Sequence, residues 1–281
     1  MTDSLSSALA PTITLARGAV MPMLGLGTWP MDDAEAAVAV KGAINAGYRL
    51  VDTAENYGNE IGVGHGVNES DVRRGDLFVT TKFNKEWHSV EGARAACLAS
   101  MERLGLDYLD LLLIHWPNPQ QGAYVEAWKG LLKLREEGLI KAAGVSNFKV
   151  DHLRRLLEET GELPEVNQIN LNPYAQRRDV VAYHAEHGVV TEAWSPIKPA
   201  AMLDDPVITG IAAAHERTPA QVALRWITQH GYVTVPKSSS RQRQTENLAI
   251  FDFTLSDEEM AAIDGLDRGD ASVVDSDKNG H

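Results

Sequence analysis

Four side chains of the types that transfer protons stand near the ends of short apolar segments. Asp52, Lys82 and His115 each end or directly follow such a segment, and Tyr57 comes soon after Asp52. If these segments are parallel strands of one barrel, their C-terminal ends meet at a single mouth. A carboxylate, a phenol, an ammonium and an imidazole gathered there would form a tunable proton donor.

Tyr57 is the member of this set best suited to donate a proton, provided that a neighbour increases its acidity. An unperturbed phenol has a pKa of about 10. At ~4 Å and an effective dielectric constant of ~20, an ammonium attracts a phenolate by ~4 kcal/mol. We therefore expect Lys82 to lower the pKa of Tyr57, with Asp52 as the counter-ion of Lys82. His115 would hydrogen-bond a substrate oxygen, on which negative charge develops when hydride reaches a carbonyl carbon.

Each of the four residues has a plainer interpretation when it is taken alone. A lysine at a strand end is usually solvated, and an aspartate there can cap a helix. Tyr57 can belong to an ordinary turn, and His115 can be a core histidine with satisfied hydrogen bonds. Their occurrence at the ends of consecutive strands favours a shared site.

Regularly spaced glycines mark the elements that must position these side chains. In seven places a helical pattern is followed by a glycine and then by a short apolar run. These glycines are Gly47, Gly75, Gly105, Gly138, Gly161, Gly188 and Gly231. Glycine suits the position after a helix because it can adopt the left-handed conformation. With the segment 23–26, the pattern predicts eight strands that alternate with helices, and hence a (β/α)8 TIM barrel of the α/β class.

The remaining segments fit around this repeat. Residues 13–21 predict a β-hairpin before the barrel, and the wide gap between Gly188 and Gly231 predicts an insertion. Capping sequences that begin at Thr218 and Ser256 predict further helices near the C-terminus. We expect a single domain over residues 1–281, of which 266–281 form a loose polar tail.

Bulk properties narrow the class of protein. The net charge of −13 over 281 residues argues against a nucleic-acid partner or an anionic membrane surface. No apolar run reaches membrane-spanning length. The single cysteine, Cys97, lies in a helical pattern that predicts a buried, inert thiol and fits a reducing compartment. These features favour a cytoplasmic protein, and a monomer needs no further assumption.

A metal site is not expected. His184 and His187 are three residues apart on a predicted helix, a spacing that can hold a metal ion. Without a third ligand nearby, the pair is more typical of a solvated helix face.

The chain resembles the aldo-keto reductases, and more narrowly the bacterial 2,5-diketo-D-gluconate reductase-like group. The resemblance spans roughly residues 12–266 in the order of the family. It rests on Gly25-Leu26-Gly27-Thr28-Trp29, Asp52-Thr53-Ala54, Tyr57-Gly58-Asn59-Glu60, Thr80-Thr81-Lys82, Leu113-Ile114-His115-Trp116-Pro117, Gly144-Val145-Ser146-Asn147-Phe148, Asn167-Gln168-Ile169, Val235-Pro236-Lys237-Ser238 and Glu246-Asn247. It implies an eight-stranded barrel, NADPH as the cofactor and reversible reduction of aldehydes or ketones. Tyr57 would be the acid, assisted by Lys82, Asp52 and His115.

The resemblance also implies the residues that hold the nicotinamide half of NADPH. Ser146, Asn147 and Gln168 would bind the carboxamide, which needs a donor and an acceptor together. Trp194 would stack on the nicotinamide ring, although a core aromatic after a buried strand is an equally good interpretation. Further cofactor contacts would come from Gly27, Thr28, Asp52, Ser195, Pro196 and Ile197. No Rossmann fingerprint competes, because Val67 occupies the third required glycine position after Gly62 and Gly64.

The adenosine half of NADPH would lie after the last strand. Lys237, Ser238 and Arg243 suit a 2′-phosphate, and barrels often bind phosphate near the final strands. Glu246 and Asn247 would reach the adenine. Ser240 departs from several bacterial relatives, which carry arginine there. The plainer interpretation of this segment is a solvated basic helix start.

The substrate pocket is defined less sharply. Trp29, Trp87 and Trp116 would form an apolar rim beside Tyr57 and His115. Asn84 departs from many relatives, which have tryptophan there, so Trp87 fills that space or the pocket is more open. Selectivity for the small carbonyl substrate would lie in residues 83–89, 116–123 and 196–205 and in the tail.

Two other functional classes stay open from the sequence. One is a weakly active nucleotide-binding sensor or accessory protein on the same barrel. The intact set of four polar residues and the lack of an added interaction domain count against it. The other is a metal-dependent barrel lyase or hydrolase. That class would need carboxylates or histidines on several strand ends, where only Asp52 and His115 qualify.

Overall fold

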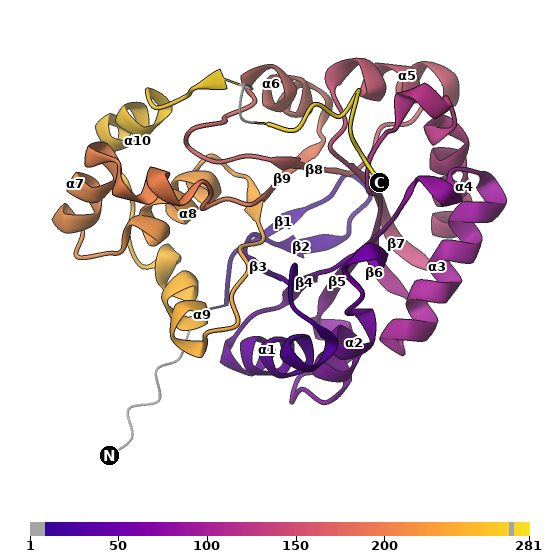
Figure 1. Ribbon diagram of the computed structural model, residues 1–281, viewed down its shortest axis with the longest axis horizontal. Coiled ribbons are helices and arrows are strands. Elements are labelled where there is room, and N and C mark those ends of the chain that lie inside the picture. The colour runs from indigo at the N-terminus through magenta and orange to yellow at the C-terminus, as the bar shows by residue number, and fades with distance from the viewer. Residues whose placement is uncertain (1–8, 270–272) are drawn as a thin grey trace.

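The computed structural model describes residues 9–269 and 273–281 and has a parallel β-barrel at its centre (Figure 1). The barrel strands are β3 (Gly25–Gly27), β4 (Leu50–Asp52), β5 (Phe78–Phe83), β6 (Leu109–Ile114), β7 (Ile140–Ser146), β8 (Val166–Asn170), β9 (Val190–Trp194) and β10 (Val233–Thr234). Each strand pairs in parallel with the next one along the chain. Bridges from Leu24 to Thr234 and from Gly27 to Lys237 join the first strand to the last. The predicted TIM barrel is confirmed.

Helices follow the strands and cover the outside of the barrel (Figure 1). They are α1 (Asp33–Ala46), α2 (Glu60–Asn68), α3 (Val90–Leu104), α4 (Tyr124–Glu136), α5 (Val150–Thr160), α6 (Arg178–His187), α8 (Pro219–Gln229) and α9 (Arg241–Leu248). The predicted insertion before α8 consists of a 3-10 helix, η5 (Ala200–Asp204), and α7 (Pro206–Ala214). A final helix, α10 (Asp257–Asp264), begins at the predicted Ser256 cap. The predicted hairpin is formed by β1 (Thr12–Thr14) and β2 (Val20–Pro22).

Six of the seven marker glycines have the left-handed or otherwise positive φ that the pattern predicts. Gly75 is the exception, because it lies inside a 3-10 turn, η2 (Arg74–Asp76), and its φ is not positive. Gly75 therefore precedes strand β5 as expected but does not end an α-helix.

The run Gly62 to Gly66, which superficially suggests nucleotide binding, serves helix packing. These residues lie inside α2, which packs between α1 and α3. A Cβ on Gly62 would stand 2.0 Å from the carbonyl oxygen of Asp33, and one on Gly64 would stand 2.2 Å from that of Leu104. Only glycine lets the three helices approach this closely.

The inside of the barrel is apolar in its lower part and polar near the mouth. Leu50, Val166 and Val190 belong to one buried apolar cluster in the barrel. Two residues later on the same strands stand Asp52, Gln168 and Glu192, all buried. Side chains two apart on a strand share a face, so these polar groups form the next layer toward the C-terminal strand ends.

The C-terminal segment lies against the barrel mouth. Lys149 Nζ is 2.5 Å from a carboxylate oxygen of both Asp275 and Asp277, and His152 Nε2 is 2.9 Å from Asp277. The chain then reaches His281, whose ring centroid is 5.0 Å from that of His115. The expectation of a loose tail over 266–281 is therefore wrong for the described residues 273–281. Lysine and histidine partners from α5 and its N-terminal cap hold their acidic side chains.

Candidate active site

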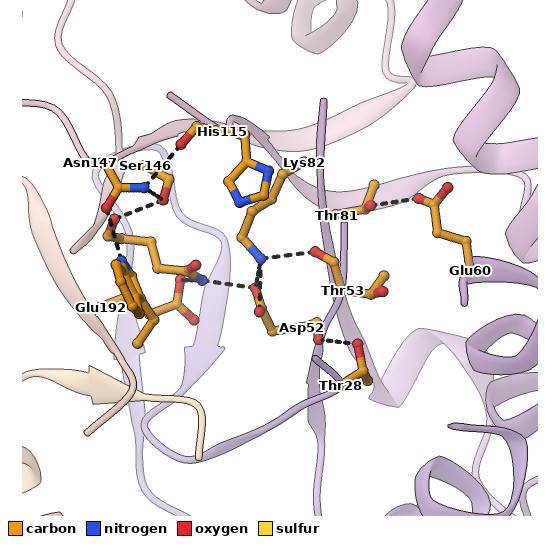
Figure 2. Close-up of polar contacts among 12 residues, drawn as sticks. Thr28, Asp52, Thr53, Glu60, Thr81, Lys82, His115, Ser146, Asn147 and Glu192 are labelled. Carbon is orange, nitrogen blue, oxygen red and sulfur yellow. Dashed lines mark hydrogen bonds and ion pairs between the residues drawn. The ribbon is translucent and has the colours of Figure 1, made fainter. Parts of the chain in front are cut away.

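Lys82 is the buried centre of the site (Figure 2). Its ammonium is 2.7 and 2.8 Å from the two carboxylate oxygens of Asp52 and donates to the carbonyl of Thr53 at 2.9 Å. The side chain of Lys82 is fully buried. Burial alone would lower the pKa of Lys82, but Asp52 and Tyr57 outweigh it and hold that pKa above its usual value. The lysine is therefore a permanent cation with one bound counter-ion.

Tyr57 lies over this cation, at the end of a 3-10 turn, η1 (Glu55–Tyr57). Lys82 Nζ is 5.2 Å from the centroid of its ring. Burial raises the pKa of Tyr57 above 10, and the charge of Lys82 only partly offsets this. Lys82 therefore acts on the pKa of Tyr57 in the expected direction, but burial raises that pKa by more than Lys82 lowers it. The free energy lost by desolvating the phenolate exceeds the stabilisation that the ammonium of Lys82 provides, because that ammonium is already paired with Asp52.

His115 faces Tyr57 across the mouth, with the two ring centroids 5.9 Å apart. Burial, and then the charge of Lys82, hold the pKa of His115 well below its usual value, so its imidazole is neutral. The Nδ1 atom is 3.3 Å from Oδ1 of Asn84. Asn84, the residue that departs from the family pattern, therefore contacts the histidine.

An amide cluster lies beside this group, on the strands β7 and β8. Gln168 Nε2 donates to Asp52 Oδ1 at 2.8 Å, and Ser146 Oγ donates to the main-chain carbonyl of Gln168 at 2.9 Å. The Asn147 side chain donates to the main-chain carbonyl of His115 and accepts from the indole of Trp194 at 2.9 Å. The structure thus brings the predicted carboxamide-binding residues to the same mouth as Asp52, Tyr57, Lys82 and His115, the predicted proton-transfer residues.

A cavity of about 380 Å³ opens over these side chains. Its walls include most of the residues expected to touch the nicotinamide half of a cofactor or the substrate. These are Gly27, Trp29, Tyr57, His115, Trp116, Ser146, Asn147, Gln168, Trp194, Ser195, Pro196 and Ile197. Lys237, which is expected at the 2′-phosphate, lines the cavity as well. Gly27 has no room for a side chain, because a Cβ would stand 2.6 Å from the carbonyl oxygen of Val235.

Several predicted site residues do not line this cavity. Trp87 is the clearest correction, because its indole donates to Glu55 at 3.0 Å and its ring packs against the core. Asp52 lies beneath the cavity floor, and Thr28 is buried with its hydroxyl donating to the main-chain carbonyl of Asp52. The remaining members of the expected cofactor set, Ser238, Arg243, Glu246 and Asn247, lie at or after the end of β10 and along α9.

In the segment after β10, the lysine expected to bind an anion already has a carboxylate partner. Lys237 Nζ is 3.3 Å from a carboxylate oxygen of Glu35 on α1. Ser240 caps α9 by accepting from the main-chain N–H of Arg243, whose side chain is exposed. Ser238 and Asn247 are buried. An anion bound here would have to compete with Glu35 for Lys237.

His184 corrects another expectation. The sequence favours a solvated helix face for His184, but the side chain is buried, and its two ring nitrogens lie 3.0 Å from Asn167 and 2.8 Å from Thr191 in hydrogen-bonding contacts. Across residues 9–269 and 273–281, no cluster of three or more His, Cys, Asp or Glu side chains is arranged to hold a metal ion. Within the same ranges, no helix is long and apolar enough to cross a membrane.

Two residues of the site were missed from the sequence. Glu192 is fully buried and accepts from Gln168 Nε2 at 2.9 Å. A carboxylate two residues after the buried Val190 was a usable signal, because alternation places both on the barrel interior. His281 lines the cavity beside Trp116. No local pattern indicates that contact, since it joins two segments far apart in the chain.

The chain belongs to the aldo/keto reductase family. Residues 22–268 match the model of that family. The chain is 49% identical over 264 residues to an aldo-keto reductase of Mycolicibacterium vanbaalenii, covering 94% of this chain and 95% of the relative. It is 44% identical over 270 residues to methylglyoxal reductase DkgA of Escherichia coli, covering 95% and 98%. The crystal structure of an Asp-to-Ala mutant of Gox0644 in complex with NADPH matches with a TM-score of 0.93 at 40% identity, covering 98% of this chain and 100% of that one.

Proposed function

We propose that this protein reduces aldehydes or ketones to alcohols with NADPH, in a reversible reaction. The observation that carries the proposal is the buried Lys82–Asp52 pair, which lies beneath Tyr57 and His115 and beneath a cavity lined by amide side chains. Relatives that bind NADPH and a relative named for methylglyoxal reduction support it.

The residues around the cavity suit a nicotinamide. Trp194 presents an aromatic ring, held by its hydrogen bond to Asn147, and Ser146 and Gln168 offer polar groups next to it. Lys237, Ser238 and Arg243 would hold the 2′-phosphate, with Glu246 and Asn247 near the adenine. Bound NADPH would supply the hydride that the carbonyl carbon accepts.

The residues of this chain would then manage the carbonyl oxygen. His115 is neutral and retains one N–H, with which it orients the carbonyl oxygen by donating a hydrogen bond. This requires the proton on Nε2, so Asn84 must turn its side-chain NH₂ group toward Nδ1 of His115. Tyr57 transfers its phenolic proton to that oxygen as the C–O double bond becomes single, and the alcohol leaves. Lys82 stabilises the phenolate that results, and Asp52 keeps Lys82 in place.

We also propose that the protein acts as a cytoplasmic monomer on small-molecule carbonyl compounds and binds no nucleic acid. Its net charge of −13 disfavours polyanionic partners. Cys97 is buried, and burial raises its pKa to about 12, which makes it an inert thiol suited to a reducing compartment.

The test is NADPH oxidation with 4-nitrobenzaldehyde and methylglyoxal, followed by absorbance. Tyr57→Phe should lower kcat by about 10²- to 10⁴-fold, the usual contribution of a positioned proton donor. NADPH affinity should stay unchanged. Tyr108→Phe, far from the mouth, is the matched control. A Tyr57→Phe protein that keeps most of its kcat contradicts the proposed role. A wild-type protein that binds NADPH without turnover supports the sensor alternative.

A further inference from the structure

Glu192 is a buried carboxyl group that the proposed reaction does not use. It lies on β9, faces the barrel interior and is fully buried (Figure 2). Its Oε2 atom accepts from Gln168 Nε2 at 2.9 Å, and its Oε1 atom has no hydrogen-bond partner among the described residues. An acidic side chain in such a place requires a reason, because burial of a carboxylate is costly.

The contact with Gln168 fixes which way that amide points. Gln168 Nε2 lies 2.8 Å from Asp52 Oδ1 and 2.9 Å from Glu192 Oε2. Asp52 is bound to an ammonium and can only accept, so the atom of Gln168 that faces it must be the NH₂ group. An NH₂ group has two hydrogens, and these two bonds use both. Gln168 therefore has only its side-chain carbonyl oxygen left to offer a ligand in the cavity.

We propose that Glu192 is a positioning residue for cofactor binding and proton transfer: it holds Gln168 as a pure acceptor toward the cavity and adds a titratable group beside the Lys82–Asp52 pair. The inference rests on the proposed function, in which a nicotinamide carboxamide binds at Gln168. A carboxamide N–H needs an acceptor, and the clamped amide supplies one in a fixed orientation.

The same carboxyl group also links the site to pH. The ionisable groups that face it are Asp52 on β4, Lys82 on β5 and Tyr57 on η1, and its neighbours Gln168 on β8 and Val233 on β10 are uncharged. Burial, and then the charge of Asp52, raise the pKa of Glu192 to about 8. At neutral pH the carboxyl is therefore mostly protonated. When it ionises, its negative charge raises the pKa of Tyr57 and helps the phenol to keep its proton.

Two substitutions separate these effects. In Glu192→Gln the new amide oxygen can still accept from Gln168, so the dissociation constant of NADPH should stay within about threefold of the wild type. In Glu192→Leu one N–H of Gln168 loses its acceptor and the amide is free to turn. NADPH should then bind about tenfold more weakly, the usual consequence of losing one buried hydrogen bond. Glu165→Gln is the matched control, because Glu165 is also buried but precedes β8 and does not line the cavity.

The pH profile of kcat for aldehyde reduction is the second measurement, taken from pH 7 to about 11.5, because the pKa of Tyr57 lies above the ordinary phenol value of about 10. In Glu192→Gln the alkaline fall in kcat should occur about 0.5 to 1 pH unit lower than in the wild type, because no second negative charge retains the proton on Tyr57. Glu165→Gln should keep the wild-type profile. A general packing defect would lower kcat at all pH values without moving this limb.

The inference is overturned if Glu192→Leu binds NADPH as tightly as the wild type, or if Glu192→Gln keeps the wild-type alkaline limb. Thermal melting shows whether the leucine variant folds; if it does not, the pH limb of Glu192→Gln decides. A wild-type protein that neither binds nor oxidises NADPH refutes the proposed function instead, so the two failures are distinguishable.

Discussion

At the residue scale, the fully buried Lys82 ties stability to activity. Its charge is compensated by Asp52 at 2.7 Å. Removing one partner of a buried ion pair leaves an uncompensated charge. We therefore expect Lys82→Met to lower the free energy of unfolding by about 3–5 kcal/mol. Adding Asp52→Asn to Lys82→Met should restore most of the free energy of unfolding but none of the carbonyl reduction. Urea unfolding and NADPH oxidation measure the two quantities.

The exposed pair of Lys129 and Glu126 provides the control for this double variant. Lys129→Met should change neither unfolding nor turnover measurably, because solvent screens an exposed pair. If the double variant of Lys82→Met and Asp52→Asn is as unstable as Lys82→Met alone, the uncompensated charge of Asp52 is not the cause of the instability.

Tyr57 shows where reasoning from residue types ends. The presence of Lys82 beside Tyr57 was predicted from their strand positions, and the structure places the ammonium 5.2 Å from the ring. The direction of the pKa was not predictable, because it depends on how much water the fold excludes. Burial dominates, and the pKa of Tyr57 rises. Neighbours can be inferred from motifs, whereas desolvation needs the packed structure.

At the scale of elements, glycines at helix contacts give a direct prediction. A Cβ on Gly64 of α2 would stand 2.2 Å from the main-chain oxygen of Leu104, so Gly64→Ala must push α2 away from α3. We expect a loss of roughly 2 kcal/mol in the free energy of unfolding, within the usual range for overpacking. Gly42→Ala in α1 is the control, because its nearest neighbour is 4.0 Å away. That change should stabilise the protein by about 0.5–1 kcal/mol through helix propensity. Urea unfolding of both variants measures this, and equal effects would contradict the packing argument.

The order of strands and helices was predictable because each αβ unit carries its own local signals. Short apolar runs, seven of them preceded by a glycine, indicated all eight strands, and capping residues indicated the helices near the C-terminus. Local signals did not predict features that depend on contacts between segments far apart in the chain. Trp87 turned to Glu55 instead of the cavity, and the segment 273–281 folded onto the mouth. Glu192 belongs to no motif, and only the alternation of side chains along β9 indicates that it faces the barrel interior.

At the scale of the whole molecule, buried neutral histidines make stability depend on pH. His88 is buried, neither nitrogen of its ring has a hydrogen-bond partner among the described residues, and burial lowers its pKa from 6.5 to about 4. Between pH 6.5 and 4, His88 is protonated in the unfolded chain but stays neutral in the folded protein. The stability contributed by neutral His88 is therefore complete above pH 6.5 and is lost as pH falls toward 4, by about 3 kcal/mol in total.

His88→Leu should flatten this part of the pH dependence, because leucine has no charge to acquire. Urea unfolding at pH 7, 6, 5 and 4.5 measures the slope of the free energy of unfolding. His65→Gln, a change on the exposed face of α2, is the control and should leave the slope as it is. A wild-type slope in His88→Leu would mean that other groups account for the loss at low pH.

The C-terminal segment couples the far end of the chain to the cavity. His281 lines the cavity beside Trp116, and Lys149 holds the segment through Asp275 and Asp277. Because the ring of His281 occupies space next to His115, we expect it to limit the size of the carbonyl substrate. His281→Gly should therefore raise kcat/KM for a bulky aromatic ketone relative to a small aldehyde by about tenfold.

Lys149→Ala should act in the same direction without touching the cavity, since it releases the segment that carries His281. Arg154→Ala is the matched control, because it removes an equal charge from an exposed pair with Asp151 on the same helix. The ratio of kcat/KM for the two substrates is the decisive quantity, because it cancels losses of active protein. If the ratio rises in His281→Gly but not in Lys149→Ala, the ring limits the cavity but the ion pairs do not hold it there. If the ratio rises in neither variant, the C-terminal segment lies over the mouth without limiting the size of the substrate.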